Sequence, residues 1–385
     1  MADPLTLIKI TIVSFAVFSM FFGSGNLVFP IAIGVETYGY ALYANLGLFV
    51  TGIIVPWIGL MSAVCSGFNQ RDYFALLGPK VGWVICFLML CLIGPLGVCP
   101  RCTLVAFGGL KVIYPTLSLW SFSLIFCALS VFIVIFDRKL IMIIGKYLTP
   151  LLLVGIFIII FANFFTSSAV VQVGESPHQS LLIGASYGYH TMDLMGALFF
   201  GFTTRSFFLS ESGKMTRLDK QKNIISSTGG MLLLAMVYSG LVYLGGKYNA
   251  HLIHAPPENY IVSLSDAVLG EKSRYIAAMI SFLACLTTIV VLMKLFGEFL
   301  QKELLKNRIN FQQSVTLTAL ITFIISLTGF TSLSQWLGLF LQTIYPALVV
   351  FALTAYFIPN KPTFIRVSFW ITVLCVNIYF YYYTL

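Results

Sequence analysis

Long uncharged apolar runs recur along the whole chain, and they constrain its fold more than any other feature. Two examples are the stretches from Leu148 to Phe165 and from Thr316 to Leu327. A helix of about 20 apolar residues crosses roughly 30 Å of hydrocarbon, whereas a membrane barrel needs strands of about 10 residues that alternate apolar with polar. The runs do not alternate, so the sequence predicts an all-α integral membrane protein.

The charged residues are too few for a soluble surface and are not arranged for nucleic acid. Only 9% of the residues are charged and 59% are hydrophobic, whereas soluble domains carry about 25% charged residues. The net charge of +9 comes from lysines and arginines that stand singly or in small groups, so we expect no nucleic-acid partner. The eight cysteines lack the spacing of a zinc site, and we expect reduced packing residues.

The apolar runs divide the chain into eleven predicted membrane spans. The spans lie near residues 9–33, 41–66, 82–110, 118–136, 141–165, 182–209, 226–247, 275–297, 314–332, 335–358 and 364–384. We predict a single transmembrane domain over residues 1–385. Within it, 9–165 and 182–358 hold five spans each, and 359–385 holds an additional C-terminal helix.

The distribution of lysine and arginine predicts the orientation of the spans. With the N-terminus inside, 17 of the 22 lysines and arginines fall on the inner side, and four fall outside: Lys111, Lys247, Lys272 and Arg274. The remaining one, Arg101, lies inside the third span. Positive residues concentrate on the cytoplasmic side of membrane proteins. We therefore predict a multi-pass protein of the cell inner membrane, with a cytoplasmic N-terminus and an external C-terminus.

The middle of the first span contains a group of weak helix formers. Gly23, Ser24, Gly25 and Asn26 follow one another there, and Pro30 comes shortly after. Such a group invites a break, whose freed backbone groups must be satisfied by a wet cavity or a ligand. A groove of small residues that lets another helix approach closely is an equally good interpretation of this span alone.

The sixth span carries one acidic residue close to its middle. Asp193 follows Thr191 and Met192 and is the only acid between Gln179 and Thr204. An ionisable group at that depth is costly and usually functional. A structural ion pair or a helix N-cap is the alternative, and an N-cap within a membrane would itself mean that a helix restarts there.

The first and sixth spans are five apart, and each carries its irregularity at mid-depth. This spacing is typical of an inverted repeat of five plus five spans with discontinuous first helices, in which helix ends at the breaks face charged ligands. The sequence therefore favours a secondary transporter. In the eighth span, Thr287 and Thr288 could supply hard oxygens to a cation if that span packs beside the first break. They could equally bond back to carbonyls one turn earlier.

Several motifs together resemble one transporter family. Residues 21–30 (FFGSGNLVFP), 94–101 (GPLGVCPR), 188–193 (GYHTMD), 284–288 (ACLTT), 333–335 (LSQ) and 344–346 (IYP) are similar to motifs of the branched-chain amino acid:cation symporter family of the BrnQ type. The resemblance implies the leucine-transporter type of fold. Gly108 departs from it, since family members often have a glutamate there.

The resemblance also implies which residues form the sites. The substrate would be held at the first and sixth breaks by Gly23, Ser24, Gly25, Asn26, Thr191, Met192 and Asp193, with backbone N–H groups on its carboxylate and Asp193 near its amino group. A sodium ion would lie between the first and eighth spans, at Ser19, Phe22, Ala284, Thr287 and Thr288.

Two functions remain open at this point, and a third is disfavoured. The first is import of leucine, isoleucine and valine by sodium symport. The second is a proton-coupled carrier of another small neutral amino acid, in which Asp193 takes up and releases the proton. An enzyme is disfavoured because no loop groups His, Asp or Glu residues that could act together. We expect no cofactor other than sodium as coupling ion, and an amino acid and the lipid bilayer as partners; the sequence indicates no oligomeric state.

Overall fold

The computed structural model describes residues 4–136, 144–163, 176–208 and 216–384, and every element in these ranges is helical. Short π or 3₁₀ segments are labelled η. The elements up to residue 163 are α1 (Pro4–Phe21), α2 (Ser24–Glu36), α3 (Ala41–Phe49), η1 (Val50–Ile54), α4 (Val55–Cys65), α5 (Gln70–Ala75), α6 (Pro79–Ile93), α7 (Val98–Ile113), α8 (Leu119–Phe136), η2 (Ile144–Leu148) and α10 (Thr149–Ala162). The later elements are α11 (Pro177–His190), α12 (Asp193–Phe208), α13 (Arg217–Lys247), α14 (Asn249–Leu252), η4 (Pro257–Asn259), α15 (Tyr260–Leu269), η5 (Glu271–Ser273), α16 (Arg274–Phe299), η6 (Leu300–Leu304), α17 (Phe311–Ser326), α18 (Phe330–Phe357) and α19 (Pro362–Thr384).

The predicted all-α membrane class is confirmed by the length and hydropathy of these helices. Seven helical stretches of the described residues qualify as membrane spans, and the bent pair of α1 and α2 makes an eighth if it counts as one. The shorter α17 is also apolar, as is the stretch 146–162. All eleven predicted segments contain helix in their described parts, but the number of eleven spans stays a prediction. Residues 141–143, 164–165 and 209 of the predicted segments lie outside the described ranges.

One predicted boundary was wrong, and glycine explains it. The segment 314–332 was predicted too long, because α17 ends at Ser326 and Gly329 precedes α18 with a φ of 86°. Few residues other than glycine adopt that backbone conformation. The segment 82–110, predicted as one span, lies within a single apolar helical stretch over Pro79–Ile113. Within this stretch a short interruption at Gly94–Gly97 separates α6 from α7.

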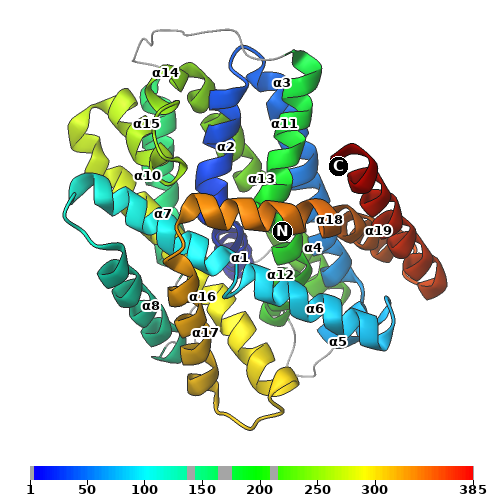
Figure 1. Ribbon diagram of the computed structural model, residues 1–385. Coiled ribbons are helices and arrows are strands. Elements are labelled where there is room, and N and C mark those ends of the chain that lie inside the picture. The colour runs from blue at the N-terminus through cyan, green and yellow to red at the C-terminus, as the bar shows by residue number, and fades with distance from the viewer. Residues whose placement is uncertain (1–3, 137–143, 164–175, 209–215, 385) are drawn as a thin grey trace.

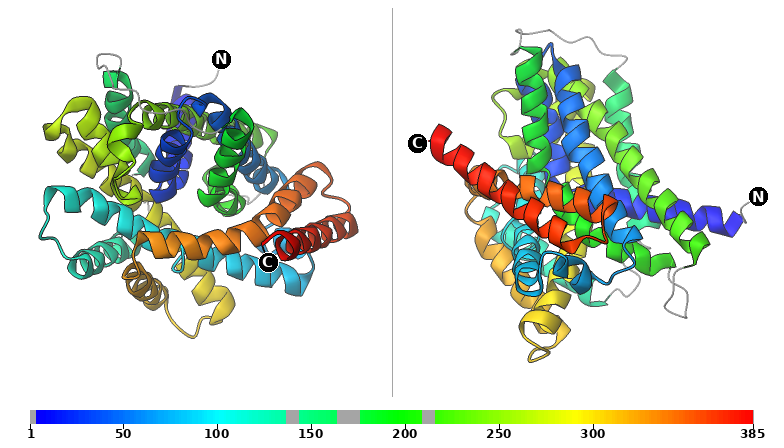
Figure 2. Two further views of the ribbon diagram at one scale, coloured as in Figure 1. Left: turned by 45° about the horizontal axis from the view of Figure 1, so that its top comes forward. Right: turned by 90° about the vertical axis from the view of Figure 1, so that its right-hand side faces the viewer.

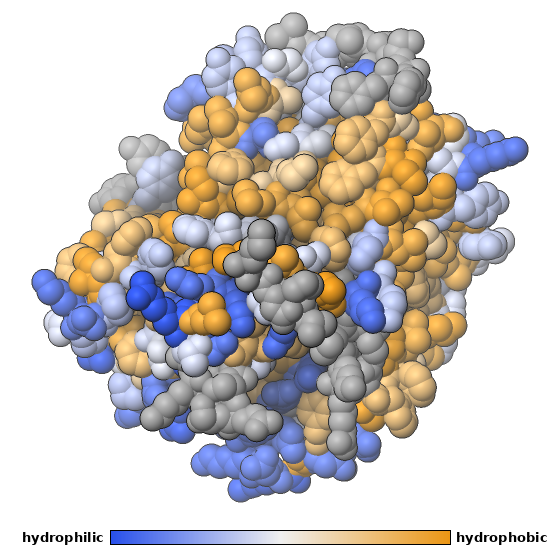
Figure 3. Space-filling view, turned by 180° about the vertical axis from the view of Figure 1, so that it is seen from behind, coloured by the Kyte–Doolittle hydropathy of each residue, from blue (hydrophilic) through white to orange (hydrophobic). Residues whose placement is uncertain are grey.

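The helices form one bundle whose apolar side chains face both inward and outward. Figure 1 shows α2 and α11 side by side, with α18 running across them. From behind, apolar residues form a broad band with hydrophilic residues above and below it (Figure 3). Ile125 of α8 and Leu374 of α19 are 67% and 61% exposed. Large apolar side chains exposed in such numbers are expected where lipid replaces water as the solvent.

Glycines bring several helix pairs into backbone contact. A Cβ added at Gly230 of α13 would lie 2.7 Å from the carbonyl oxygen of Ser14 in α1. A Cβ at Gly34 of α2 would overlap the carbonyl of Val242, also in α13. Van der Waals contact of this kind drives helix association in membranes, where no hydrophobic effect separates helix from lipid. As a result, α13 packs tightly against both halves of the first span.

The first span is broken where the sequence predicted, but the break is shorter than expected. α1 and α2 are bent by 69° relative to each other, and the right-hand view of Figure 2 shows α1 leaving the bundle sideways. Only Phe22 and Gly23 stand between them. The prediction that Ser24, Gly25 and Asn26 are unwound was wrong, because these three residues form the first turn of α2. The Asn26 side chain closes that turn by accepting a hydrogen bond from the Gly23 N–H at 3.4 Å.

The sixth span is broken at the predicted residues. α11 ends at His190 and α12 begins at Asp193, which leaves Thr191 and Met192 between them. The φ of Met192 is 63°, a backbone conformation that residues other than Gly, Asn and Asp rarely adopt. Strain of this kind persists only where the surrounding structure enforces it, and such places cluster at functional sites.

Candidate functional site

A buried hydrogen-bonded triangle joins the two broken spans. Asn26, in the first turn of α2, donates through Nδ2 to both carboxylate oxygens of Asp193 at 2.9 Å. The hydroxyl of Tyr238, from α13, donates to Asp193 Oδ2 at 2.6 Å and also contacts Asn26 Nδ2. All three side chains are buried. The structure therefore brings Asn26 and Asp193 together, although 166 residues separate them along the chain.

Asp193 also begins the second half of the sixth span. Its backbone N–H donates to Thr191 Oγ1 at 3.4 Å, and the next N–H, of Leu194, donates to the hydroxyl of Tyr345 at 3.0 Å. A carboxylate in the first turn of a helix is stabilised by the positive end of the helix dipole. The two interpretations of Asp193 left open by the sequence, a helix start and a binding group, are therefore compatible. Its two oxygens retain acceptor capacity beyond the bonds from Asn26 and Tyr238.

A buried arginine also contacts the first turn of α2. Arg101, in the first turns of α7, donates through Nη1 to the carbonyl of His190 at 2.8 Å and through Nη2 to that of Thr191 at 3.5 Å. Its Nε donates to the hydroxyl of Ser24 at 3.3 Å, and its guanidinium lies 5.1 Å from the centre of the Phe29 ring. Arg101 thereby connects the start of α2 with the end of α11.

Sequence reasoning did not assign a role to Arg101, Tyr238 or Tyr345. For Arg101 a signal was present, since it is the only one of the 22 lysines and arginines that falls inside a predicted span without lying near its end. For Tyr345 the only signal was its place in the motif of residues 344–346, and for Tyr238 there was none. Each stands in an apolar segment among other aromatic residues, and only the packing of α13 and α18 brings its hydroxyl to Asp193 or to the neighbouring N–H.

Of the predicted sodium residues, Thr288 and Ser19 lie in contact where α1 ends against α16. Thr288 Oγ1 donates to the carbonyl of Ser19 at 3.2 Å, which shows that this threonine reaches across to the first span. Thr287 Oγ1 instead donates to the carbonyl of Ala284 at 3.0 Å, one turn earlier in its own helix. A Cβ at Gly23 would lie 2.8 Å from Thr288 Oγ1, so the first break itself borders this group.

The oxygens gathered at this place are of the kind that bind sodium. Carbonyl and hydroxyl oxygens are hard ligands suited to hard cations. The Ser19 hydroxyl is buried and has no hydrogen-bond partner among the described residues, which leaves one further oxygen free to coordinate. Phe22 contributes a ring that stacks on Phe18 at 4.9 Å, while its position directly after α1 places its backbone at the break. Within the described residues, no group of three or more His, Cys, Asp or Glu could hold a metal ion.

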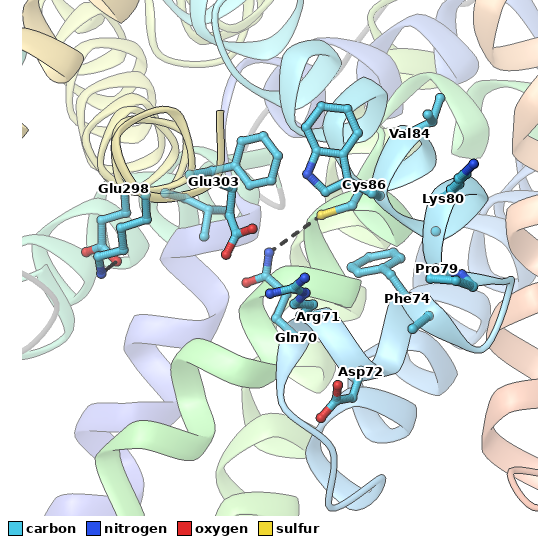
Figure 4. Close-up of a pocket in the computed structure, with 16 residues that line it drawn as sticks. Gln70, Arg71, Asp72, Phe74, Pro79, Lys80, Val84, Cys86, Glu298 and Glu303 are labelled. Carbon is cyan, nitrogen blue, oxygen red and sulfur yellow. Dashed lines mark hydrogen bonds and ion pairs between the residues drawn. The ribbon is translucent and has the colours of Figure 1, made fainter. Parts of the chain in front are cut away.

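A separate cavity of about 750 Å³ contains none of the predicted site residues. It lies between α5 and α6 on one side and the end of α16 with η6 on the other, and its lining includes Gln70, Trp83, Glu298 and Glu303 (Figure 4). In Figure 4 the labelled charged side chains point in different directions and do not converge on one point. We therefore do not assign the substrate to this cavity.

Solved structures with a similar arrangement of helices cover most of this chain. The nucleobase-cation-symport-1 family transporter Mhp1, in a closed conformation with bromovinylhydantoin bound, aligns with 91% of this chain and 78% of its own, with a TM-score of 0.67 and 12% identity. MhsT in complex with L-phenylalanine aligns with 96% of this chain and 97% of its own, with a TM-score of 0.63 and 14% identity. These likenesses confirm the leucine-transporter type of fold.

Characterised and named relatives share more of the sequence. The branched-chain amino acid transport system 2 carrier protein of Pseudomonas aeruginosa is 28% identical over 362 residues, which cover 89% of this chain and 79% of the relative. The branched-chain amino acid permease BrnQ of Corynebacterium glutamicum is 28% identical over 345 residues, with the same coverage of 89% and 79%. The sequence pattern of the branched-chain amino acid transport protein family matches residues 6–381, and the chain therefore belongs to this family.

Proposed function

We propose that this protein is a secondary active transporter that imports leucine, isoleucine and valine together with sodium. The choice of substrate is supported by the family and by the two relatives named for branched-chain amino acids. The observation that carries a transport mechanism is the direct bond between Asn26 and Asp193. Because it joins the two broken spans, a ligand that binds there acts on both halves of the fold at once.

The substrate's two charged ends have complementary places at the breaks. The α-ammonium group is assigned to Asp193, whose buried carboxylate gains a cationic partner in this way. The α-carboxylate is assigned to the first turn of α2, where the N–H groups of Ser24, Gly25 and Asn26 precede the first helical hydrogen bond, Leu27 N–H to the Gly23 carbonyl. The exposed N–H groups and the dipole of a helix start favour an anion.

The sodium ion is assigned to the oxygens between α1 and α16. Its ligands are the carbonyls of Ser19, Phe22 and Ala284 and the hydroxyls of Thr287 and Thr288. The reach of Thr288 to the Ser19 carbonyl supports this assignment, because it brings oxygens of both helices to one place. Since α1 ends at this site and the substrate is assigned to the start of α2, an ion that fixes the bend between the two helices also fixes the substrate site.

A proton-coupled carrier of another small neutral amino acid is the competing function, and one observation favours it. Among the described residues, Asp193 is the only acidic side chain that is buried. A proton carried through the membrane region therefore has one obvious acceptor. No observation favours an enzyme, and the transporters among its relatives and structural neighbours speak against one.

Purified protein in liposomes distinguishes these functions. Uptake of radiolabelled leucine is measured with an inward sodium gradient at equal pH, and with an inward proton gradient in potassium. Sodium symport predicts accumulation in the first condition only, with isoleucine and valine as competitors. Accumulation driven by the proton gradient alone would replace sodium symport with the competing function.

For localisation, we propose a cell inner membrane protein with a cytoplasmic N-terminus.

A further inference from the structure

Two charged side chains of opposite sign are buried in the described part of the chain, and both contact the first turn of α2. They are Arg101 and Asp193, with exposed fractions of 1% and 3%. The carboxylate of Asp193 receives hydrogen bonds from neutral groups, Asn26 and Tyr238. None of the ion pairs among the described residues includes Arg101. The two charges attract each other through space, but neither has an opposite charge within ion-pair distance among the described residues. A buried charge without a close counter-charge is costly, so each of the two can gain from a charged partner.

The guanidinium of Arg101 keeps hydrogen-bonding capacity that the protein does not use. It has five N–H donors, and three are engaged, by Ser24 Oγ and by the carbonyls of His190 and Thr191. The other two have no hydrogen-bond partner among the described residues. Phe29 covers one face of the guanidinium but accepts no such bond. The group is therefore held in place at its edges, and its charge interacts with that of Asp193 only through space, without an ion pair.

The unused side of the guanidinium borders the first turn of α2. Nη2 lies 2.6 Å from the position that a Cβ on Gly25 would occupy, and only a glycine allows that approach. At the same turn, the N–H groups of Ser24 and Gly25 precede the first helical hydrogen bond, from the Leu27 N–H to the Gly23 carbonyl, and the Ser24 N–H also faces the thiol of Cys102. Backbone donors at a helix start and a guanidinium fixed beside them form a site for an anion with two oxygens.

We infer that Arg101 binds the α-carboxylate of the transported amino acid, together with the first turn of α2. This inference rests on the proposed function and adds a specificity-determining residue to it. Arg101 and Asp193 then select for a zwitterion, since one fixed charge meets the carboxylate and the other the ammonium group. A ligand that lacks either end leaves one buried charge without its partner.

Leucinamide tests this assignment, because it keeps the ammonium group and side chain of leucine but has no carboxylate. Binding of both ligands is measured on detergent-solubilised protein in sodium chloride. A hydrogen bond to a charged group contributes about 1.5–3 kcal/mol, so the wild-type protein should bind leucine roughly 10- to 150-fold more tightly than leucinamide. In Arg101→Gln the leucine and leucinamide affinities should differ by no more than about threefold. The affinity for leucinamide should stay close to that of the wild type. Arg101→Lys should retain part of the ratio.

Two further variants keep the test decisive if Arg101→Gln does not fold. Gly25→Ala pushes a methyl group against Nη2 and should lower leucine affinity more than leucinamide affinity. Arg366→Gln is the matched control, since this arginine donates to the carbonyl of Leu76 at 3.0 Å, between α5 and α19 and away from both breaks. It should leave the ratio unchanged.

Three outcomes would overturn the role of Arg101. The first is equal affinity for leucine and leucinamide in the wild type. The second is a parallel loss of both affinities in the folded Arg101 and Gly25 variants, which would mean a positioning role only. The third is loss of the ratio in wild-type protein when the sodium chloride concentration is lowered with sucrose in its place, which would mean that the ratio depends on chloride held by the guanidinium. If wild-type protein in liposomes takes up no leucine, the proposed transport function is wrong. If it takes up leucine but one of these three outcomes is found, only the role of Arg101 is wrong.

Discussion

Replacement of Asp193 by asparagine removes the charge at the centre of the site and keeps its shape. Both carboxylate oxygens lie 2.9 Å from Asn26 Nδ2, so whichever oxygen becomes an NH₂ group then faces another donor. An unsatisfied buried donor costs about 1–3 kcal/mol, and the lost charged bond to the substrate ammonium group a further ~1.5–3 kcal/mol. The first cost lowers the free energy of unfolding, because the donor–donor contact is present with and without substrate. The second corresponds to a loss of leucine affinity of roughly 10- to 150-fold.

Equilibrium binding of radiolabelled leucine in sodium measures this loss directly. Size-exclusion chromatography and thermal unfolding establish whether Asp193→Asn is folded. We expect it to fold, because the donor–donor contact is the one interaction that lowers its free energy of unfolding. Asp219→Asn is the matched control, since this acid caps the exposed start of α13 through its bonds with Thr216 and should bind leucine as the wild type does. If folded Asp193→Asn binds leucine within about threefold of the wild type, Asp193 is a structural cap and does not bind the substrate.

Three other predictions follow from the same geometry. Thr288→Ala should raise the sodium concentration for half-maximal leucine uptake by about tenfold, while Thr288→Ser, which keeps the oxygen, should change it little; an unchanged sodium dependence in Thr288→Ala would contradict the sodium site. Tyr238→Phe removes a 2.6 Å hydrogen bond to Asp193 and should lower the free energy of unfolding by about 0.5–1.5 kcal/mol. It should lower leucine affinity less than Asp193→Asn does. An equally large effect on affinity would place Tyr238 in direct contact with the substrate. A reporter active only in the cytoplasm, fused after Leu385, should be silent, and an active reporter would overturn the predicted eleven spans.

Local sequence signals placed the apolar helices and, once the first and sixth spans were compared, both breaks. The uncharged runs, the weak helix formers around Gly23 and the lone acid Asp193 all act within one segment of chain, and the structure has helices and interruptions there. The extent of the first break was not predictable in this way. Ser24 and Asn26 have low helix propensity, but the Asn26 side chain accepts the Gly23 N–H and turns the predicted loop into a helix start.

Contacts between distant segments were beyond what the sequence could indicate. The Thr288 hydroxyl reaches the Ser19 carbonyl, whereas the neighbouring Thr287 bonds within its own helix. The two threonines are adjacent and chemically identical, so only the rotation of α16 against α1 decides between them. Tyr238 is a similar case, because its hydroxyl could have faced lipid from another side of α13. Tertiary packing, and no property of the residue itself, makes it part of the site.

The fit of α13 to both halves of the first span has a mechanical consequence. Ser14, which meets Gly230 of α13, lies nine residues before Gly23, or about 13 Å along a helix. If α1 rotates about Gly23 by about 20°, Ser14 moves by roughly 5 Å, close to the 5.4 Å repeat of a helix surface. Two helices in backbone contact cannot keep their packing at intermediate displacements. They pack closely again only when one has moved by a full turn relative to the other. A rotation of α1 would therefore be a two-state change between two packed positions, and intermediate positions would be little populated.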